Sequence, residues 1–248
     1  MPSEKLGSSE PQRGSSEPQR GSGSESRLIP ALATRFRFPH PDTADDDGFL
    51  AVGGDLKPGT LVHAYSNGIF PWTTHPITWW SPDPRAIIPI GGAHVSHSMR
   101  KILRRPGVIV SFDRAFRQVM EECAGPRPGR DGVWISRPFV TAYTRLFELG
   151  FAHSVEIWRG ERLVGGLYGV SIGEFFAGES MFGSEANASK VALIMMEEKL
   201  RAGGFTLFDV QFLTPHLQSM GAIEIPRGEY LDRLREAVAG SAMRESTI

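Results

Sequence analysis

The chain has 248 residues, with 27 Lys and Arg against 28 Asp and Glu, which gives a formal net charge of −1 at pH 7. Hydrophobic residues make up 40% of the chain, enough to form a core, so a wholly disordered protein is excluded. The near-zero charge argues against a uniformly basic nucleic-acid binder but is compatible with a local basic patch. No apolar run approaches the ~18 residues that a membrane span needs.

Both ends of the chain are predicted to be tails. In residues 1–34 the sequence GSSEPQR occurs twice in succession, and too few apolar residues are present to form a core, so this segment is predicted to be disordered. Residues 241–248 are predicted to form a short C-terminal tail. The N-terminus lacks the apolar stretch of a signal peptide, and Cys123, the only cysteine, cannot form an intramolecular disulfide. We therefore expect a protein of the reducing cytoplasm.

Residues 35–85 are predicted to form a small N-terminal domain. Residues 58–67 have apolar side chains at helical spacing, and Gly68 is placed to end that helix. GIFPW at 68–72 and TWWSPDPR at 78–85 are rich in aromatic residues and interrupted by proline. We interpret both as irregular segments that pack on a surface or line a cleft.

From residue 86 onwards, apolar patterns typical of helices and strands alternate up to residue 240. Three successive strands form an antiparallel meander, and a long helix then crosses over to another strand. This order indicates an α+β fold, in which a mixed sheet is flanked by helices, and it resembles that of GNAT-like (N-acetyltransferase) folds. The predicted strands are 86–90, 108–112, 154–158, 162–172, 174–182, 205–212 and 223–226, and the predicted helices are 96–105, 113–123, 138–149, 184–202 and 228–239.

Three motifs in this part are interpreted without a catalytic or metal-binding role. GVSIG at 169–173 matches the hydrolase elbow G-x-S-x-G, but a strand follows it instead of a helix, so we predict a hairpin turn. His94 and His97 have no obvious carboxylate or thiol partner, so no metal site is expected. RLVGGL at 162–167 fails the pyrophosphate-binding pattern [QR]-x-x-G-x-[GA] at its last position and lies inside a strand. An acyltransferase-like fold is therefore expected to use an acyl donor other than CoA.

An acid and an amide stand out in the predicted strand FTLFDVQF at 205–212. Asp209 and Gln211 are two residues apart, so we expect them to project from one face, with Phe208, Val210 and Phe212 on the other. A buried acid beside a carboxamide must be hydrogen-bonded or functional. The alternative is that Asp209 caps a neighbouring helix.

Basic residues and aromatic residues form a second candidate site. Four cations cluster on one predicted helix, and three more flank the loop around Trp134. A cluster of this kind often does no more than face solvent. Together with aromatic side chains that we expect to be exposed, however, it would suit the end or a loop of a nucleic acid. The cations are Arg100, Lys101, Arg104 and Arg105 on the helix and Arg127, Arg130 and Arg137 by the loop; the aromatic residues are Tyr65, Trp72, Trp79, Trp80 and Trp134.

The order of several motifs resembles the leucyl/phenylalanyl-tRNA–protein transferase family over about residues 36–231. The words that carry the resemblance are DGFLAVGGDL, AYSNGIFPW, TWWSPDPR, AHSVEIW, LVGGLYGV, FAGESMF, ANASK and FDVQF. The resemblance implies a small N-terminal domain before a GNAT-like domain, with no metal or organic cofactor. It also implies transfer of Leu or Phe, and less readily Met, from aminoacyl-tRNA to the N-terminal Arg or Lys of a protein, which marks that protein for N-degron degradation.

The resemblance also implies roles for individual residues. Asp209 and Gln211 match the pair discussed as catalytic in the family, and Glu179 matches a carboxylate of the site. Leu167, Met196 and Phe208 differ from residues found in some relatives, so the preference among Leu, Phe and Met stays open. The matching residues around the terminal adenosine are Tyr65, Trp72 and Trp134, and those of the side-chain pocket are Leu167, Phe176, Met181, Leu193, Met196 and Phe208.

From these residues a mechanism follows in which the enzyme mainly positions two reactive groups. The donor ester is already activated, and an α-amine with a pKa near ~8 is partly neutral at pH 7. We expect Gln211, oriented by Asp209, to contact the amine or the carbonyl, with Asp209 possible as an aid to proton removal. Glu179 is the first candidate to bind the acceptor's Arg or Lys and Asp209 the second, while Arg100, Lys101, Arg104 and Arg105 are expected to bind the tRNA backbone.

Two other functions remain open at this stage. One is a GNAT acetyltransferase that uses acetyl-CoA, against which the missing pyrophosphate loop argues. The other is a non-catalytic RNA-binding module that keeps the aromatic residues and the basic helix. We expect a monomer with no membrane partner.

Overall fold

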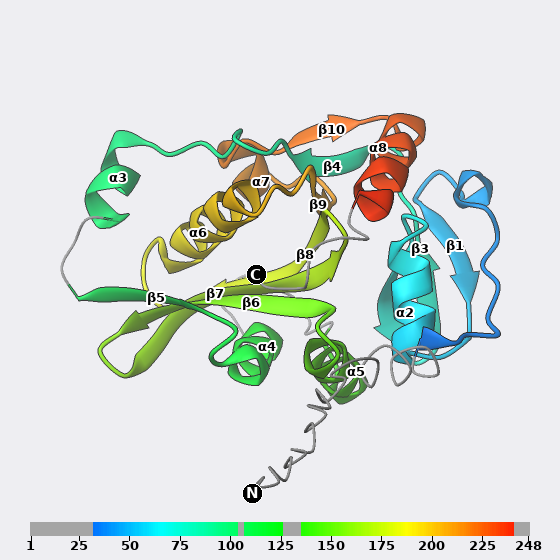
Figure 1. Cartoon of the computed structure of the whole chain (residues 1–248), viewed down its shortest axis with the longest axis horizontal. Coiled ribbons are helices and arrows are strands. Elements are labelled where there is room, and N and C mark those ends of the chain that lie inside the picture. Colours follow the sequence, from blue (N-terminus) through cyan, green and yellow to red (C-terminus); the bar gives the residue numbers. More distant parts are fainter. Residues whose placement is uncertain (1–31, 104–106, 126–134, 241–248) are drawn as a thin grey trace, which may run out of the picture.

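The computed structural model describes residues 32–103, 107–125 and 135–240 (Figure 1). The predicted tails therefore lie almost wholly outside the described residues. Five residues of the predicted basic and aromatic sites also lie outside them. These are the cations Arg104, Arg105, Arg127 and Arg130 and the aromatic residue Trp134.

The N-terminal part contains a small sheet and one α-helix (Figure 1). Its three strands lie in the order β1-β3-β2 and pair antiparallel. The predicted helix is confirmed. The interpretation of GIFPW and TWWSPDPR as irregular is wrong, because both contribute strands to this sheet. The elements are η1 (Pro41–Thr43), β1 (Phe49–Val52), α2 (Pro58–Tyr65), β2 (Phe70–Thr74) and β3 (Ile77–Trp80).

Pro71 explains why β2 was missed. Proline has no backbone N–H and is tolerated in a sheet at an edge strand or a bulge. β2 is an edge strand, and its register with β3 shifts between Pro71 and Thr73. The sequence of β2, which proline interrupts, therefore has the pattern of an irregular segment.

The main sheet has seven strands in the order β10-β4-β9-β8-β7-β6-β5. β8 and β9 pair parallel, and the neighbouring pairs are antiparallel. The predicted meander and its crossover to β9 are confirmed, as is the hairpin turn at GVSIG between β7 and β8. The strands are β4 (Arg85–Ile88), β5 (Val108–Phe112), β6 (Ala152–Arg159), β7 (Arg162–Ile172), β8 (Phe175–Gly183), β9 (Leu207–Gln211) and β10 (Ile223–Ile225).

Helices cover both faces of the sheet (Figure 1). α6 packs on one face, over a core that includes Leu167, Phe176 and Phe208. α4 and α5 pack on the other face, over a core that also includes Tyr65 of α2 and Tyr230 of α8. The helices are α3 (His97–Leu103), α4 (Phe116–Ala124), α5 (Arg137–Glu148), α6 (Ala188–Ala202), α7 (Pro215–Ser219) and α8 (Arg227–Ala239).

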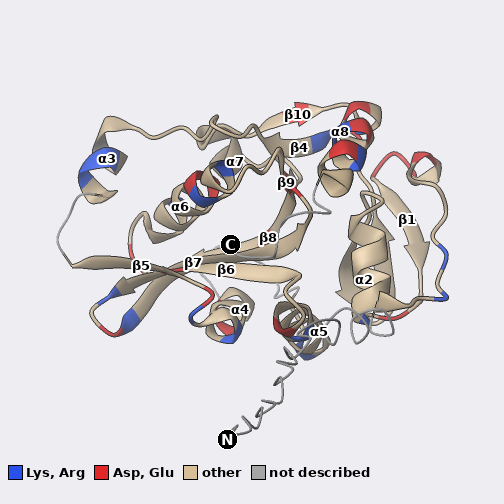
Figure 2. Cartoon of the chain, viewed as in Figure 1, with Lys and Arg blue, Asp and Glu red and all other residues tan. Residues whose placement is uncertain are grey.

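The close packing of α6 depends on a glycine in β7. A Cβ added to Gly165 would lie 2.7 Å from the Cβ of Ala188, at the start of α6. Glycine therefore lets the helix approach the sheet. Charged side chains occur on α3, α4, α6 and α8 (Figure 2). Within the described residues, no helix is both long and apolar enough to cross a membrane.

Candidate functional site

A cavity of about 390 Å³ lies where β8 and β9 separate. The two strands pair only from 175 to 177 and from 207 to 209, after which β8 continues alone beside β7. The space between them is closed by the start of α6 and by α7. Its lining residues are Leu167, Gly178, Glu179, Ser180, Met181, Gly183, Ser189, Leu193, Val210, Gln211, Thr214, His216 and Leu217.

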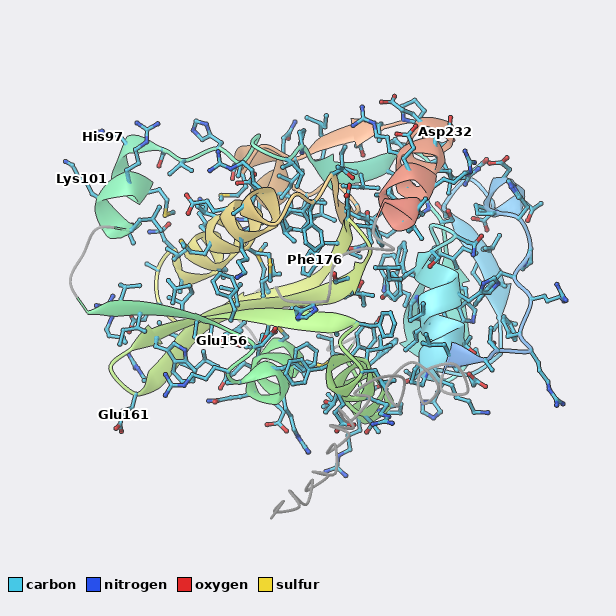
Figure 3. All side chains as sticks on the ribbon, viewed as in Figure 1. His97, Lys101, Glu156, Glu161, Phe176 and Asp232 are labelled. Carbon is cyan, nitrogen blue, oxygen red and sulfur yellow. The ribbon has the colours of Figure 1, made fainter. Side chains whose placement is uncertain are left out.

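The predicted apolar pocket residues fall into two groups. Leu167, Met181 and Leu193 line the cavity. The other three, Phe176, Met196 and Phe208, are fully buried in the same apolar cluster. Figure 3 labels Phe176, which lies between α6 and the sheet. The rings of Phe176 and Phe208 meet edge to face with centroids 5.5 Å apart. The cavity thus has an apolar wall of three predicted residues, backed by three more.

Glu179 adds a carboxyl group to the lining of the cavity. Its Oε2 accepts a hydrogen bond of 3.3 Å from the hydroxyl of Tyr143, which shares a hydrogen bond with the hydroxyl of Tyr65. Its Oε1 is buried and has no hydrogen-bond partner among the described residues. Burial raises the pKa of Glu179 to about 8, although the tyrosine hydroxyls act in the opposite direction. A cation bound beside Glu179 would therefore favour the ionised form of its carboxyl group.

Asp209 is completely buried and paired with Arg85. Arg85 Nε donates to Oδ1 at 2.8 Å and Nη2 donates to Oδ2 at 2.6 Å, an arrangement with two parallel hydrogen bonds. The hydroxyl of Tyr230 donates to Oδ2 at 3.1 Å. Burial acts to lower the pKa of Arg85, but the charge of Asp209, together with Tyr230, the hydrogen bonds to Asp209 and Glu179, outweighs burial and raises that pKa above its usual value. The alternative in which Asp209 caps a helix is wrong, because its partners are these side chains and the backbone of Gln211.

Gln211 departs from the extended conformation of the strand. Its φ is +59°, and its backbone N–H donates to Asp209 Oδ1 at 3.0 Å. Side chains therefore stop alternating between the two faces of the sheet at Gln211. Gln211 lines the cavity beside Val210, whereas Phe212 packs with Phe70 on the other side of the sheet. The predicted sharing of one face by Asp209 and Gln211, and of the other by Phe208, Val210 and Phe212, is therefore wrong beyond residue 210. The carboxamide Nε2 of Gln211 is buried without a partner among the described residues.

The aromatic residues are less exposed than expected. Tyr65 and Trp79 are buried, and their polar groups are satisfied inside the protein. The hydroxyl of Tyr65 shares a hydrogen bond with that of Tyr143, and the indole N–H of Trp79 donates to the carbonyl of Gly53 at 2.8 Å. Trp80 is half-buried. Trp72 is 37% exposed, and its ring lies 4.9 Å from that of Phe212, the neighbour of Gln211. Of the described aromatic residues predicted to be exposed, Trp72 is thus the one with an exposed ring.

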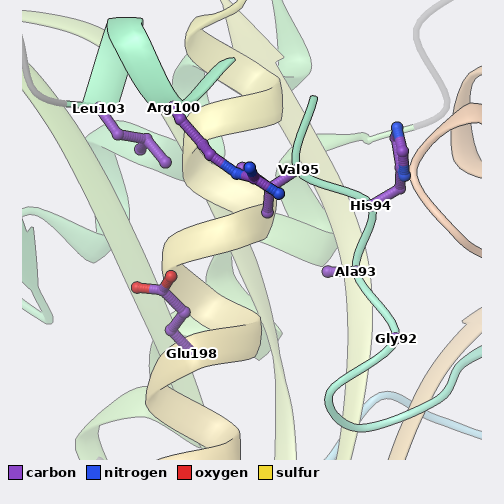
Figure 4. Close-up of a pocket in the computed structure, with 7 residues that line it drawn as sticks. All are labelled: Gly92, Ala93, His94, Val95, Arg100, Leu103 and Glu198. Atoms are coloured by element: carbon purple, nitrogen blue, oxygen red, sulfur yellow. The ribbon is translucent and has the colours of Figure 1, made fainter. Parts of the chain in front are cut away.

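The basic helix α3 lines a different pocket, which shares no lining residue with this cavity. Arg100 and Lys101 are exposed on α3, as expected. Arg100 reaches across α6 towards Val95, where a surface pocket of about 580 Å³ also includes His94 and Glu198 (Figure 4). The described residues contain no group of three His, Cys, Asp or Glu side chains that could hold a metal ion.

Four polar residues of the site were not predicted from the sequence. Arg85, Tyr143 and Tyr230 are buried in β4, α5 and α8. Arg85 ends the word TWWSPDPR, which gave it no role, and the two tyrosines lie in no motif that the sequence analysis used. Their only signal is a polar group on an otherwise apolar face. His216 lines the cavity on α7, and burial, followed by the charge of Lys190, lowers the pKa of its imidazole.

The topology and the cavity together define the class. The described part of the chain has the strand and helix order of a GNAT-like enzyme, with a separate N-terminal domain and a cavity at the diverging parallel strands. Two family models match the chain: leucyl/phenylalanyl-tRNA protein transferase over residues 87–235 and the N-terminal domain of that transferase over residues 54–83. The chain belongs to the leucyl/phenylalanyl-tRNA–protein transferase family and is an aminoacyltransferase.

Curated relatives agree with the family models. The chain is 52% identical over 205 residues to a leucyl/phenylalanyl-tRNA–protein transferase of Thiobacillus denitrificans, which covers 81% of this chain and 90% of the relative. It is 50% identical over 210 residues to that of Hahella chejuensis, with coverages of 83% and 90%. The resemblance stated from the motifs is confirmed.

Solved structures give more distant matches. L-PGS from Bacillus licheniformis matches with a TM-score of 0.38 and 15% identity, over 59% of this chain and 49% of that one. A GCN5-related N-acetyltransferase from Kribbella flavida matches with a TM-score of 0.38 and 10% identity, over 67% and 60%.

Proposed function

We propose that this enzyme transfers Leu or Phe, and less readily Met, from aminoacyl-tRNA to the N-terminal Arg or Lys of acceptor proteins. The product is a new peptide bond at the acceptor's N-terminus, which marks the acceptor for degradation through the N-end rule. The proposal rests on membership of the family and on one observation. One cavity combines an apolar wall with the carboxyl of Glu179 and the carboxamide of Gln211, each of which has a buried polar atom without a partner in the part of the chain that the structure describes.

The apolar wall suits the side chain of the donor amino acid. Leu167, Met181 and Leu193 offer no hydrogen-bond partner to a polar side chain, which would lose its hydration without compensation. Differences of one methylene group change binding by only ~1–3 kcal/mol in such a pocket, so some transfer of Met is expected. The shape of the wall therefore separates classes of side chain better than it separates Leu, Phe and Met.

Glu179 suits the guanidinium or ammonium group of the acceptor residue. Its buried Oε1 has no hydrogen-bond partner among the described residues, and a cation placed beside it would supply the missing charge and hydrogen bonds. Asp209, the second candidate in the sequence, already accepts bonds from Arg85 and Tyr230 at its two oxygens. We therefore favour Glu179 over Asp209 for this contact.

The reaction itself needs orientation more than activation. The neutral α-amine of the acceptor attacks the ester carbonyl carbon and forms the new C–N bond, and the bond to the ribose oxygen breaks. The nitrogen gives up one proton, and the ribose oxygen receives one, so that the products are the amide and the free ribose hydroxyl. Holding the two reactants in contact can supply on the order of 7–11 kcal/mol of the barrier. Gln211 is placed to contact the amine or the carbonyl oxygen, because its Nε2 is a buried donor without a partner among the described residues.

The tRNA is proposed to bind at two places. Trp72 and Trp134 are assigned to the terminal adenosine, with the exposed ring of Trp72 as the stacking surface, and the buried Tyr65 is assigned to support this site through its hydrogen bond with Tyr143. Arg100, Lys101, Arg104 and Arg105 are assigned to the phosphate backbone, and binding through them weakens as the salt concentration rises.

No organic cofactor or metal is part of the proposal. The protein is proposed to act as a monomer in the cytoplasm, where aminoacyl-tRNA is available, without a membrane partner.

The test is transfer of labelled leucine from charged tRNA to a peptide that begins with Arg. We expect transfer to the Arg-starting and Lys-starting peptides, and none to the same peptide with an acetylated N-terminus. Donor preference is measured with Leu-tRNA, Phe-tRNA and Met-tRNA in parallel. Binding of the tRNA without transfer, or stabilisation by acetyl-CoA in a thermal-shift assay, would refute the proposal in favour of an RNA-binding module or an acetyltransferase.

For Glu179, the deciding variant is Glu179→Gln. It keeps the size of the side chain and removes its charge. We expect it to lose the preference for Arg over a neutral N-terminal residue while it retains affinity for aminoacyl-tRNA. A variant that still discriminates as the wild type does would show that another group binds the acceptor's cation.

A further inference from the structure

We propose that Arg85 is a positioning residue of the transfer reaction. Through Asp209 it fixes the backbone of Gln211, and with it the place of the Gln211 carboxamide in the cavity. In this proposal Asp209 holds Gln211 in position and does not take the proton of the acceptor amine. The inference rests on the proposed function and concerns residues that lie behind the cavity wall.

The position of Arg85 is fixed on every side. Its side chain is 1% exposed, and that of Asp209 is not exposed at all. Its Nη1 donates to the carbonyl of Gly68, just after α2, at 3.0 Å. Its guanidinium carbon lies 4.8 Å from the ring centroid of Phe70 and 4.5 Å from that of Tyr230. A buried guanidinium therefore links the N-terminal part, α8 and β9 in one geometry.

One oxygen of Asp209 connects Arg85 to Gln211. Asp209 Oδ1 accepts both the Nε–H of Arg85 and the backbone N–H of Gln211. The left-handed φ of +59° at Gln211 is uncommon for a residue with a Cβ and needs support from its surroundings. The register between β4 and β9 also shifts beside Arg85, between Ala86 and Ile87. The bond to Asp209 is thus what holds Gln211 in a strained backbone conformation.

The hydrogen bonds of Asp209 leave it no site for a proton. Its two oxygens accept four donors: Nε and Nη2 of Arg85, the hydroxyl of Tyr230 and the N–H of Gln211. A carboxylate offers about four lone-pair positions. The titratable groups around it are Arg85, Tyr230 and, at the cavity wall, Glu179. A base for the acceptor amine would need a free lone pair that faces the cavity.

A double-mutant cycle tests the proposal. Arg85→Lys keeps the charge but loses the paired bonds, and Asp209→Asn keeps the size but loses the charge. Gln211→Gly removes the carboxamide, and glycine accepts the left-handed backbone. In the wild-type background we expect Arg85→Lys and Asp209→Asn to lower kcat by about 100-fold, the scale of a 1 Å misplacement, with KM for aminoacyl-tRNA nearly unchanged. In the Gln211→Gly background they should have almost no further effect.

The control is Arg227→Lys. Arg227 also joins the N-terminal part to α8, since its Nη1 donates to the carbonyl of Ser81 at 2.8 Å, but among the described residues it forms no hydrogen bond with Asp209 or Gln211. It should leave kcat unchanged. An equal loss of kcat from Arg85→Lys with and without Gln211 would overturn the proposal, because Arg85 would then act independently. So would a pH–rate profile that loses its acidic limb in Asp209→Asn, since Asp209 would then be the base.

A measurement without catalysis separates this inference from the proposed function. With glutamine labelled by ¹⁵N, the backbone N–H signal of Gln211 should move in Arg85→Lys and Asp209→Asn and stay in place in Arg227→Lys. Unmoved signals in the first two variants would refute the link to Gln211, whatever the enzyme transfers. A wild type that transfers nothing while these signals move would refute the proposed function alone.

Discussion

The buried carboxyl of Glu179 makes the stability of the protein depend on pH in a defined direction. Burial raises its pKa from the ordinary value of 4.5 to about 8. Between these two pH values the folded protein keeps the proton, while the unfolded chain loses it. The contribution of Glu179 to stability is therefore fully present below pH 4.5 and is lost as the pH rises towards 8.

The size of this loss follows from the shift. At ~1.4 kcal/mol for each pKa unit, the free energy of unfolding falls by up to about 5 kcal/mol above pH 8, and by about 3 kcal/mol at pH 7. Glu179→Gln stays neutral at every pH and escapes this loss. We expect the variant to match the wild type near pH 4.5 and to be the more stable protein at pH 7 and above, by several kcal/mol at pH 8.

Denaturant unfolding at a series of pH values measures the difference. Glu121→Gln is the control, because Glu121 is an exposed residue paired with Arg117 at the surface, and such pairs contribute only ~0–1 kcal/mol. It should change stability little at any pH. If Glu179→Gln and the wild type differ by the same amount at pH 5 and pH 8, the carboxyl does not titrate as its burial requires, and the argument from Glu179 fails.

Three further predictions concern the substrates. Binding of an Arg-starting peptide at pH 7 should release a proton from Glu179, seen as a buffer-dependent heat in calorimetry that Glu179→Gln lacks. Leu193→Trp should fill the cavity and abolish transfer of Phe in the labelled-peptide assay, while Leu193→Met should change transfer of Leu by roughly ten-fold or less. Arg100→Ala with Lys101→Ala should lower the slope of log affinity for tRNA against log salt by roughly 0.7–0.9 for each lost phosphate contact, with kcat unchanged. An unchanged slope would show that α3 does not touch the backbone.

Local patterns were enough to predict the main sheet. The meander β6–β8, the crossover helix α6 and strand β9 each have an apolar pattern that a single segment reveals. The small N-terminal sheet was not predicted, because β2 contains Pro71 and is supported only by pairing with β3. A sequence pattern can identify a strand whose own residues show apolar periodicity, but not a strand that forms only through pairing with a neighbouring strand.

The site was predicted in part for a similar reason. Glu179, Gln211 and the apolar wall were found because their motifs are local and specific. The partner of Asp209 was not, since Arg85 lies 124 positions away in the chain and only the pairing of β4 with β9 brings the two together. The backbone conformation of Gln211 depends on that same pair, so the sequence pattern assigned Gln211 to the wrong face.

Asp209 of β9 pairs with Arg85, whose guanidinium also donates to the carbonyl of Gly68. These contacts limit how far the enzyme can be shortened from its N-terminal side. A fragment that starts at β5 would retain Asp209 in the interior but lose its counter-ion, and removing one partner of a buried ion pair costs about 3–5 kcal/mol. Such a fragment would also leave the tyrosine pair behind Glu179 incomplete, because Tyr65 belongs to α2. Attempts to graft the transfer chemistry onto a smaller scaffold would have to carry the N-terminal part along, as an internal component of the catalytic unit.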